Sequence, residues 1–394
     1  MTSNSYQSYW SLNPQVTFLN HGSFGACPLP VLATQAKFRE QLERQPLLFF
    51  NRQWEILLDE ARICLVKFLS TDAEDLVFLP NATTGVNTVL RSLQFAPGDE
   101  LLTTDQEYNA CRNALDFVAE KSGAKIVVAS IPFPITSADQ VVEAVLSQVT
   151  ERTKLVLISH ITSQTALIFP VQQLVQALSS QGIDTLIDGA HAVGMLDLNL
   201  PELGATYYAG NCHKWLCAPK GAGFLYVAKE KQELIRPLVI SHGANSPRRD
   251  KSRFQLEFDW QGTVEPSAFL AVPSAIAFFH DLLPGGWAEL REHNHQLVLA
   301  GKNLLQSTLG ASAVCPDEMI GAMAVIQLPP DNQLDNPRSF LAPLQDDLWY
   351  QFNIEVPIIY WPAKPQQLLR ITAHIYNSLS DYEYLAESLQ KLLI

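Results

Sequence analysis

The stretch that decides the fold is GNCHKWLCAPKGAGFLYV, which runs from Gly210 to Val227. It places Lys214 between a histidine and a tryptophan, ahead of a glycine-rich turn and an apolar run. The apolar run predicts a buried strand, and the short gap before it predicts an antiparallel pair with the apolar run that ends at Gly210. A protein core disfavours the amine of Lys214, and a surface loop does not need the ring of Trp215. The rest of the sequence must therefore define the surroundings of Lys214.

Upstream of this stretch, short apolar runs alternate with helix-like segments. The runs are LVFL from Leu76, ELLTT from Glu100, KIVVASI from Lys125, KLVLISH from Lys154, DTLID ending at Asp188, ATYYAG ending at Gly210 and GFLYVA from Gly223. Strands that alternate with helices predict an α/β fold with a mostly parallel sheet. Because the runs are almost continuously apolar, we expect helices on both faces of that sheet. From about Pro273 long helices and separate strands predict a smaller α+β domain.

Composition excludes several classes of partner. The chain has 394 residues and a formal net charge of −13, which argues against nucleic acid and against an anionic membrane surface. The sequence shows no secretory signal and no apolar run near the ~20 residues of a membrane helix. The six cysteines are scattered without a CxxC pair, which favours reduced thiols in a cytoplasmic protein and predicts no metal site.

Polar residues follow the predicted strands, where open parallel sheets bind ligands. The segment NATTG from Asn81 could offer N–H groups and hydroxyls to an anion, or serve only as a helix cap. No GxxxxGK[ST] or GxGxxG motif occurs, which argues against ATP and dinucleotides.

Three further residues carry the chemistry. Asp188 ends an apolar strand and needs a cationic partner there, unless it only caps a helix. His191 follows closely and could act on the same ligand, although a lone histidine is more often a packed polar residue. Lys214 would become a nucleophile if desolvated, whereas an ordinary lysine lies at the surface. With Tyr108 as a stacking ring, these residues meet the demands of pyridoxal phosphate: a Schiff-base amine, a partner for the ring nitrogen, a phosphate cradle and a ring clamp.

With these residues in place, the sequence resembles fold-type I pyridoxal-phosphate enzymes of the class V aminotransferase family, in the isopenicillin N epimerase-like branch. The matching segments are LNHGSFGACP from Leu19, NATTGVNTVLRSL from Asn81, EYNACRNAL from Glu107, SHITSQT from Ser159, DGAHAVG from Asp188, GNCHKWLCAPKGAGFL from Gly210, WQGTVEPSAFLAVP from Trp260 and LRITAHIYNSLSDYEYL from Leu369. The resemblance implies a seven-stranded, mostly parallel sheet with helices on both faces. It also implies an N-terminal segment 1–24 at the mouth of the active site, a large cofactor-binding domain 25–272 and a small C-terminal domain 273–394.

The resemblance also implies roles for single residues. Lys214 would form the Schiff base with pyridoxal 5'-phosphate, Asp188 would pair with the ring nitrogen, and His191 would lie near the ring 3′-oxygen. Tyr108 would stack on the ring. The remaining residues of the implied cofactor site are Asn81, Ala82, Thr83, His160, Asn211 and His213. The family usually has serine where this chain has Asn211.

For the substrate, an amino acid or a derivative of one, the resemblance implies that Arg370 binds the α-carboxylate. A salt bridge within the small domain is the alternative for Arg370. Asn20, His21 and Tyr360 would lie near the substrate. Thr263 would reach the phosphate from the other subunit of a homodimer, whose active site would lie at the subunit interface.

The reaction implied is chemistry at the α-carbon through an external aldimine and a quinonoid, with epimerisation favoured. Epimerisation needs an acid opposite Lys214, and the sequence does not rank Tyr108, His21, His160 and Tyr360 for that role. β-Elimination of a cysteine derivative (C–S lysis) and transamination are the alternatives. Persulfide-forming desulfuration is disfavoured, because the segment EVPIIYWPAKPQQLLR from Glu355 has no cysteine. A nucleotide-dependent enzyme or oxidoreductase and a non-catalytic relative are the hypotheses outside this class.

Overall fold

The computed structural model describes residues 6–331 and 341–393. Its main sheet has seven strands in the order β2-β8-β7-β6-β5-β3-β4. In chain order they are β2 Leu76–Leu79, β3 Glu100–Thr104, β4 Lys125–Ala129, β5 Thr153–Ser159, β6 Asp184–Gly189, β7 Tyr207–Asn211 and β8 Gly223–Val227. The predicted sheet is confirmed, with strand ends within two residues of the expected positions.

The strand directions bring the functional residues to one edge. Strands β4, β3, β5, β6 and β7 are mutually parallel, whereas β8 runs antiparallel to both β7 and β2. The predicted antiparallel pair β7–β8 is therefore confirmed. Because the carboxyl ends of parallel strands meet at the same edge, the segments that follow β3, β5, β6 and β7 lie together there.

Helices cover both faces of the sheet because successive strand residues point to opposite sides. On strand β2, Val77 and Leu79 pack with α5 (Ala82–Ser92) and α6 (Asn109–Ser122) on one face. Phe78 points to the other face, whose core includes α4 (Trp54–Phe68) and α8 (Val171–Ser179). The strands are thus apolar on both faces, as their nearly continuous apolar sequence predicts.

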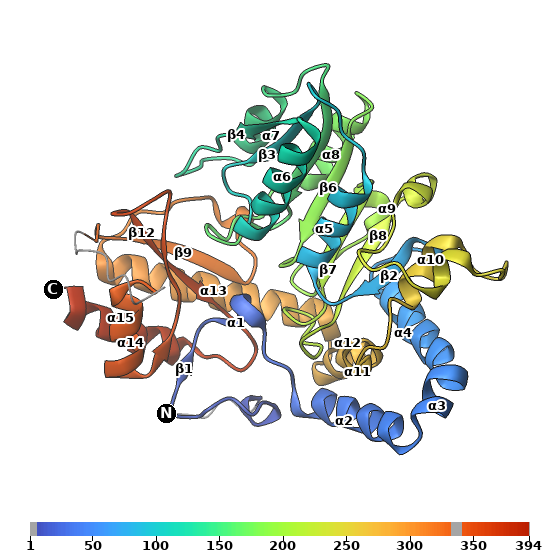
Figure 1. Cartoon of the computed structure of the whole chain (residues 1–394). Coiled ribbons are helices and arrows are strands. Elements are labelled where there is room, and N and C mark those ends of the chain that lie inside the picture. Colours follow the sequence, from blue (N-terminus) through green and yellow to red (C-terminus); the bar gives the residue numbers. More distant parts are fainter. Residues whose placement is uncertain (1–5, 332–340, 394) are drawn as a thin grey trace.

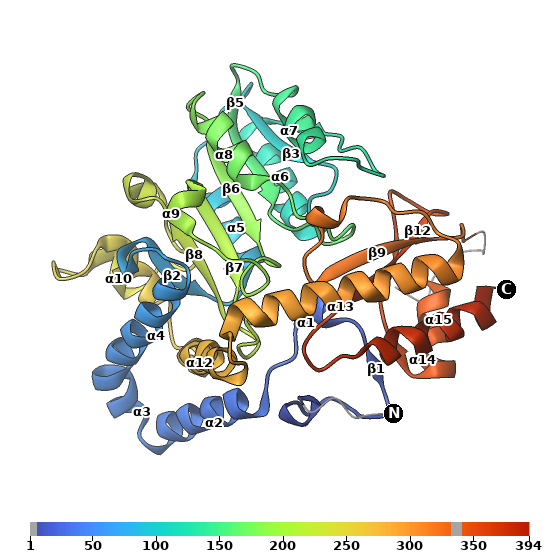
Figure 2. The same cartoon turned by 180° about the vertical axis from the view of Figure 1, so that it is seen from behind.

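The C-terminal part forms a second, smaller unit. Its antiparallel sheet has the order β11-β12-β9, formed by Ile358–Tyr360, Gln367–Thr372 and Met323–Leu328. Strand β1 (Thr17–Phe18) pairs with β10 (Ile354–Glu355), so the N-terminal segment joins this unit. Helix α13 (Gly286–Leu309) runs from the large unit to the small one in both views (Figures 1 and 2).

The other helices complete the two units. They are α1 His21–Phe24, α2 Leu29–Arg44, α3 Pro46–Leu48, α7 Asp139–Leu146, α9 Leu200–Leu203, α10 Arg253–Asp259, α11 Ser267–Leu270, α12 Val272–Leu282, α14 Pro343–Phe352 and α15 Leu379–Leu393. Helix α12 contacts α2 and α4, while α13 contacts α15 and β9. The boundaries 1–24, 25–272 and 273–394 stay predictions, and residues 1–5 of the first segment lie outside the described residues.

Within the described residues, no single helix has both the length and the apolar composition to cross a membrane. Ser267–Leu282 and Gly286–Leu309 reach that length and composition only as a pair, bent by 76°.

Candidate active site

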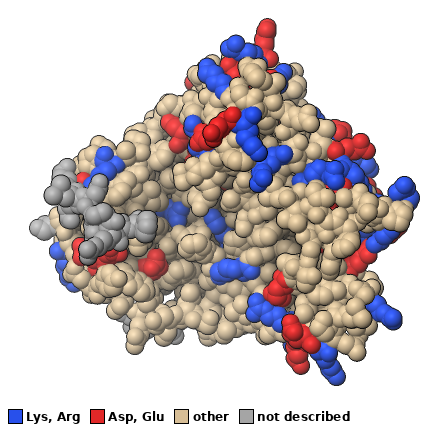
Figure 3. Space-filling model, in the orientation of Figure 1, with Lys and Arg blue, Asp and Glu red and all other residues tan. Residues whose placement is uncertain are grey.

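A cavity of about 140 Å³ lies at the carboxyl ends of the sheet strands. Its walls are formed by Ser23, Phe24, Asn81, Thr83, Tyr108, Ser159, Ile161, Ser163, Asp188, Ala190, His191, Asn211, His213 and Lys214. Figure 3 shows a hollow between the large and small units on this side of the molecule. The structure thus brings together eight of the residues predicted from the sequence: Asn81, Thr83, Tyr108, Asp188, His191, Asn211, His213 and Lys214.

Lys214 faces His191 across the cavity. Its Nζ lies 3.1 Å from His191 Nε2, and Trp215 Nε1 donates to His191 Nδ1 at 3.3 Å. Because the indole can only donate, Nδ1 of a neutral His191 is the acceptor and its proton sits on Nε2. That proton points at Nζ, an arrangement that suits a neutral amine. Burial lowers the pKa of Lys214 to about 8, consistent with this geometry.

Asp188 is held by two donors at the end of β6. Its Oδ1 accepts from the Ala190 amide at 2.9 Å, and its Oδ2 accepts from Cys111 Sγ at 3.1 Å. The residue is buried, and desolvation raises the pKa of its carboxyl. A carboxylate in this position gains most from a cationic partner, which a protonated ring nitrogen provides.

The start of helix α5 is capped by two asparagines. Asn81 Oδ1 accepts from the Thr84 amide at 2.8 Å, and Asn211 Oδ1 accepts from the Ala82 amide at 2.8 Å. Ala82, which was predicted to bind the cofactor, therefore donates its amide to Asn211. Thr83 lies between these two amides with its side chain at the cavity, so it is the hydroxyl that remains for an anion at this helix end.

His213 also lines the cavity. Its Nδ1 donates to the Ala222 carbonyl at 3.0 Å, which leaves Nε2 without a proton in the neutral ring. Burial lowers the pKa of this imidazole to about 4. A phosphate would therefore have to raise the pKa of His213 before Nε2 could donate to it.

Arg370 of β12 is buried beside the cavity. Its Nη2 donates to Ser23 Oγ at 3.0 Å and its Nη1 donates to the Ser163 carbonyl. Among the described residues no carboxylate pairs with Arg370, and its buried Nε has no hydrogen-bond partner. The predicted alternative, a salt bridge within the small unit, is absent from that part of the chain. The arrangement suits an external carboxylate.

The N-terminal motif contributes both to the cavity and to its support. Ser23 and Phe24 line the cavity, whereas His21 and Gly25 lie beneath Lys214. His21 is fully buried; its Nε2 donates to the Lys214 carbonyl at 3.1 Å and its Nδ1 accepts from Tyr376 Oη at 2.8 Å. Gly25 has φ +71° and ψ 164°, and a Cβ there would lie 2.2 Å from the His213 carbonyl oxygen. The segment therefore holds the backbone of the Lys214 turn.

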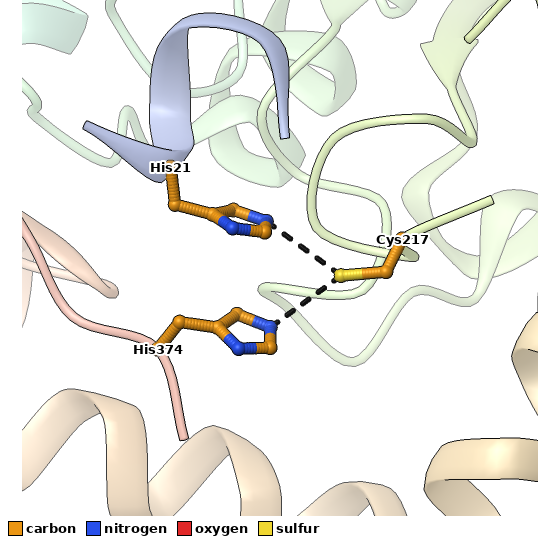
Figure 4. A group of neighbouring side chains, drawn as sticks. All are labelled: His21, Cys217 and His374. Atoms are coloured by element: carbon orange, nitrogen blue, oxygen red, sulfur yellow. Dashed lines mark hydrogen bonds between the residues drawn. The ribbon is translucent and has the colours of Figure 1, made fainter. Parts of the chain in front are cut away.

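A buried cluster extends from His21, as Figure 4 shows. Cys217 Sγ lies 3.6 Å from His21 Nε2 and 3.5 Å from His374 Nε2. These three side chains are the kinds that bind zinc. However, the two imidazole rings stack at 4.3 Å with 17° between their planes, so one ion cannot lie near both ring planes. His21 Nε2 is also engaged by Lys214, and we interpret the cluster as packing.

Seven predicted residues lie outside the cavity walls, including Ala82 and Arg370, which are described above. Asn20 Nδ2 donates to Glu355, and Tyr360 donates to Asp331. His160 points away from the cavity because it follows Ser159 along the strand; its Nδ1 contacts Tyr208 Oη and it lines a different hollow. Thr263 also lines a different hollow, beside Trp54 and Phe78. His21, also described above, lies beneath Lys214.

Sequence reasoning missed four residues at the site. Ser23 and Ser163 orient Arg370, Phe24 lines the cavity, and Glu107 lies behind Asp188. Ser23 and Phe24 belong to LNHGSFG and Ser163 to SHITSQT, so the motifs contained the signal. Without a fold, nothing in the motifs separated residues that face the cavity from those that support its walls.

Comparisons with known proteins agree with this site. Residues 28–328 match the family described as aminotransferase class-V. The chain is 36% identical to isopenicillin N epimerase of Amycolatopsis lactamdurans, over 97% of this chain and 96% of that protein. It is 28% identical to a probable chloroplastic L-cysteine desulfhydrase of Arabidopsis thaliana, over 97% and 84% of the two chains.

Solved structures give the same fold. The cystine C–S lyase C-DES, in complex with cysteine persulfide, matches with a TM-score of 0.79 at 20% identity, over 95% of this chain and 97% of that one. The apo cysteine desulfurase of Thermococcus onnurineus NA1 matches with a TM-score of 0.77 at 18% identity, over 98% and 97%. The chain belongs to the class V aminotransferase family, and its fold is that of fold-type I pyridoxal-phosphate enzymes.

The cofactor of this family, pyridoxal 5'-phosphate, fits the cavity. The walls supply an amine with lowered pKa, a buried carboxylate and the threonine hydroxyl at a helix N-terminus. These are the groups needed to hold an aldehyde, a ring nitrogen and a phosphate. Lys214, Asp188 and Thr83 would hold the respective parts of the cofactor.

Proposed function

We propose that the protein epimerises the α-carbon of an amino acid or an amino-acid derivative. The similarity to isopenicillin N epimerase over almost the full chain supports this choice. The observation that carries it is that two groups able to move a proton, Lys214 and Tyr108, line one cavity. Of the four acids that the sequence left unranked, only Tyr108 lies there; His21 is buried, His160 faces elsewhere and Tyr360 bonds Asp331.

In the proposed mechanism, the bound cofactor serves as the electron sink for the α-carbon. Arg370 binds the α-carboxylate and fixes the substrate relative to Lys214. Lys214 Nζ, with its pKa lowered to about 8, accepts the α-proton. Tyr108 Oη returns a proton to the opposite side of the carbon, which inverts the configuration. Asp188 supports these steps by holding the ring nitrogen in its protonated form.

β-Elimination of a cysteine derivative is the second candidate. The L-cysteine desulfhydrase relative supports it, and it requires only proton removal at Lys214 and departure of the β-substituent. Transamination is the third possibility within the family. Persulfide-forming desulfuration is disfavoured: all six cysteines are among the described residues, and none of them lines the cavity.

The test is a substrate panel in deuterated buffer with wild type, Tyr108→Phe and the control Tyr350→Phe, whose ring is exposed at 77%. The panel includes isopenicillin N and L-cysteine. For an epimerase, wild type and Tyr350→Phe yield the deuterated opposite epimer. Tyr108→Phe should lose inversion by about 10²-fold or more while it still exchanges the α-hydrogen with retention.

Other outcomes reject the proposal. Pyruvate and sulfide from L-cysteine, with no inversion of any substrate, would establish the lyase. Keto-acid exchange alone would establish a transaminase. If Tyr108→Phe inverts its substrate as fast as wild type, the protein is an epimerase but Tyr108 is not its acid.

A further inference from the structure

A second buried carboxyl group lies behind Asp188. Glu107 follows β3 and precedes α6, and only 6% of its surface is exposed. Ligand atoms of Glu107, Cys111 and Asp188 all lie within 4.8 Å of one another. Glu107 does not line the cavity, so it acts on the cofactor indirectly, through the residues beside it.

The hydrogen bonds of the two carboxyl groups differ. Both oxygens of Asp188 accept from donors, Ala190 N and Cys111 Sγ. Glu107 Oε1 accepts from Ser159 Oγ and from the Tyr108 amide, both at 2.9 Å. Glu107 Oε2 is buried and has no partner among the described residues. An ionised Oε2 would carry charge with no donor to stabilise it, whereas a protonated Oε2 would be neutral.

Two neighbouring carboxyl groups cannot both ionise easily in a buried site. The charged and titratable groups around the pair are the Cys111 thiol from α6, Lys214 beyond Asp188, and Tyr208 from β7, which faces Asp188. Lys214 favours ionisation of Asp188, and no cation in the described part of the chain faces Glu107. Burial and the Asp188 charge raise the pKa of Glu107 to about 8. The proton of the pair therefore belongs on Glu107.

We propose that Glu107 is a positioning residue that holds a proton on Oε2 at neutral pH. As a neutral acid it leaves Asp188 as the ionised member of the pair, directed at the ring nitrogen of the cofactor. Glu107 thus sets how strongly Asp188 holds that nitrogen. The proposal is independent of which reaction follows at the α-carbon.

The test compares Glu107→Gln with Glu100→Gln. Glu100 is a good control because it is also buried, begins the same strand β3 and accepts from the hydroxyl of Thr150, as Glu107 does from Ser159. The first measurement is the infrared spectrum of the cofactor-free protein from pH 5 to pH 9. Wild type and Glu100→Gln should show a protonated-carboxyl C=O band that fades around pH 8. The band should be missing in Glu107→Gln.

The second measurement is thermal unfolding of the same proteins. Between about pH 4.3 and pH 8 an unfolded chain ionises Glu107 while the folded protein keeps it protonated. Wild type should therefore lose stability relative to Glu107→Gln as the pH rises through this window. Glu100 should show no trend in this window. Its hydrogen bond from Thr150 lowers its pKa, so wild type gains on Glu100→Gln only as the pH rises through the range below about 4.3.

The third measurement is titration of cofactor-free protein with pyridoxal 5'-phosphate at pH 7. Glu107→Gln keeps a neutral polar side chain behind Asp188 and should bind the cofactor within about threefold of wild type. Glu107→Leu removes the acceptor of the Ser159 hydroxyl and the Tyr108 amide and should bind the cofactor about tenfold more weakly. If Glu107→Leu does not fold, the infrared and pH measurements on Glu107→Gln still decide. A wild-type spectrum without the band, or with a band that persists in Glu107→Gln, overturns the proposal.

Discussion

At the scale of single residues, Asn211 supports the start of the helix that lies at the cavity. The family resemblance predicts a phosphate contact at this position. In the structure Asn211 Oδ1 accepts from the Ala82 amide, so the side chain caps the helix that would bind the phosphate. A side chain from β7 thereby fixes where α5 begins.

Replacement of Asn211 tests this cap. Asn211→Ala should lower the free energy of unfolding by about 1 kcal/mol and weaken cofactor binding, because the start of α5 is no longer fixed. Chemical denaturation and cofactor titration measure the two effects. Asn199, which caps the short helix α9 away from the cavity, gives the control. Asn199→Ala should lose stability without a change in cofactor affinity. Equal affinity in Asn211→Ala would contradict the proposed role.

Lys214 provides a prediction on pH. Burial lowers the pKa of its amine to about 8, against about 10.4 for an ordinary lysine. Only the neutral amine is nucleophilic, so the reactivity of Lys214 should follow its neutral fraction. That fraction should reach one half at about pH 8 and level off near one at higher pH. In cofactor-free protein, modification of Lys214 by an amine-selective reagent should follow that curve, measured by mass spectrometry of the peptide. Surface lysines in the same digest give the comparison, and a midpoint near theirs would be inconsistent with a desolvated amine.

At the scale of elements, the segment from Leu19 to Gly25 supports the Lys214 turn from below. His21 donates to the Lys214 carbonyl, and Gly25 packs against the backbone of His213 and Lys214. Gly25 is required because its backbone angles are accessible almost only to glycine and because a Cβ would collide with the turn. Residues almost 200 positions apart in the sequence thus form one wall of the site.

Gly25→Ala should therefore reduce stability by about 2 kcal/mol or more and impair cofactor binding. Gly98→Ala is a matched control: Gly98 also has a positive φ, +96°, but a Cβ there meets nothing within 4 Å. Gly98→Ala should lose stability because of its backbone angles, but it should bind the cofactor as tightly as wild type. Thermal unfolding and cofactor titration distinguish the two variants. If both bind the cofactor equally well, the contact of Gly25 with the turn is unimportant.

At the scale of the whole molecule, the site draws on both units. The small unit contributes Arg370, the large unit Lys214 and Asp188, and the N-terminal segment Ser23 and Phe24. Thr263 lies at a separate hollow of the same chain. The family resemblance implies a homodimer in which Thr263 serves the site of the other subunit, and we propose that arrangement here.

Complementation tests the dimer. A site formed in trans needs Lys214 from one subunit and Thr263 from its partner. Mixed dimers of Lys214→Ala and Thr263→Ala would then contain one intact site, with up to half the cofactor and activity of wild-type dimers. Each variant alone should bind the cofactor more weakly than wild type. If mixing after denaturation and refolding restores nothing while dimers form, Thr263 does not act in trans.

The sequence by itself determined the sheet, the family and the residues that meet at the strand ends. Apolar runs separated by helical segments define strands buried on both faces, and this local pattern does not depend on distant contacts. Lys214, Asp188 and Tyr108 follow such runs, so their convergence could be predicted. Successive side chains of a strand point to opposite sides of the sheet, however, so Ser159 lies at the cavity and His160 points away from it.

Only the tertiary structure decided which motif residues face the cavity and which support it. Asn20, His21 and Tyr360 belong to segments near the site, but their side chains bond Glu355, Tyr376 and Asp331. Ser23, Ser163 and Glu107 gained roles through partners far away in the chain. The physical reason is that a side chain's direction, burial and proton affinity depend on neighbours brought close by folding, and a linear motif does not specify these neighbours.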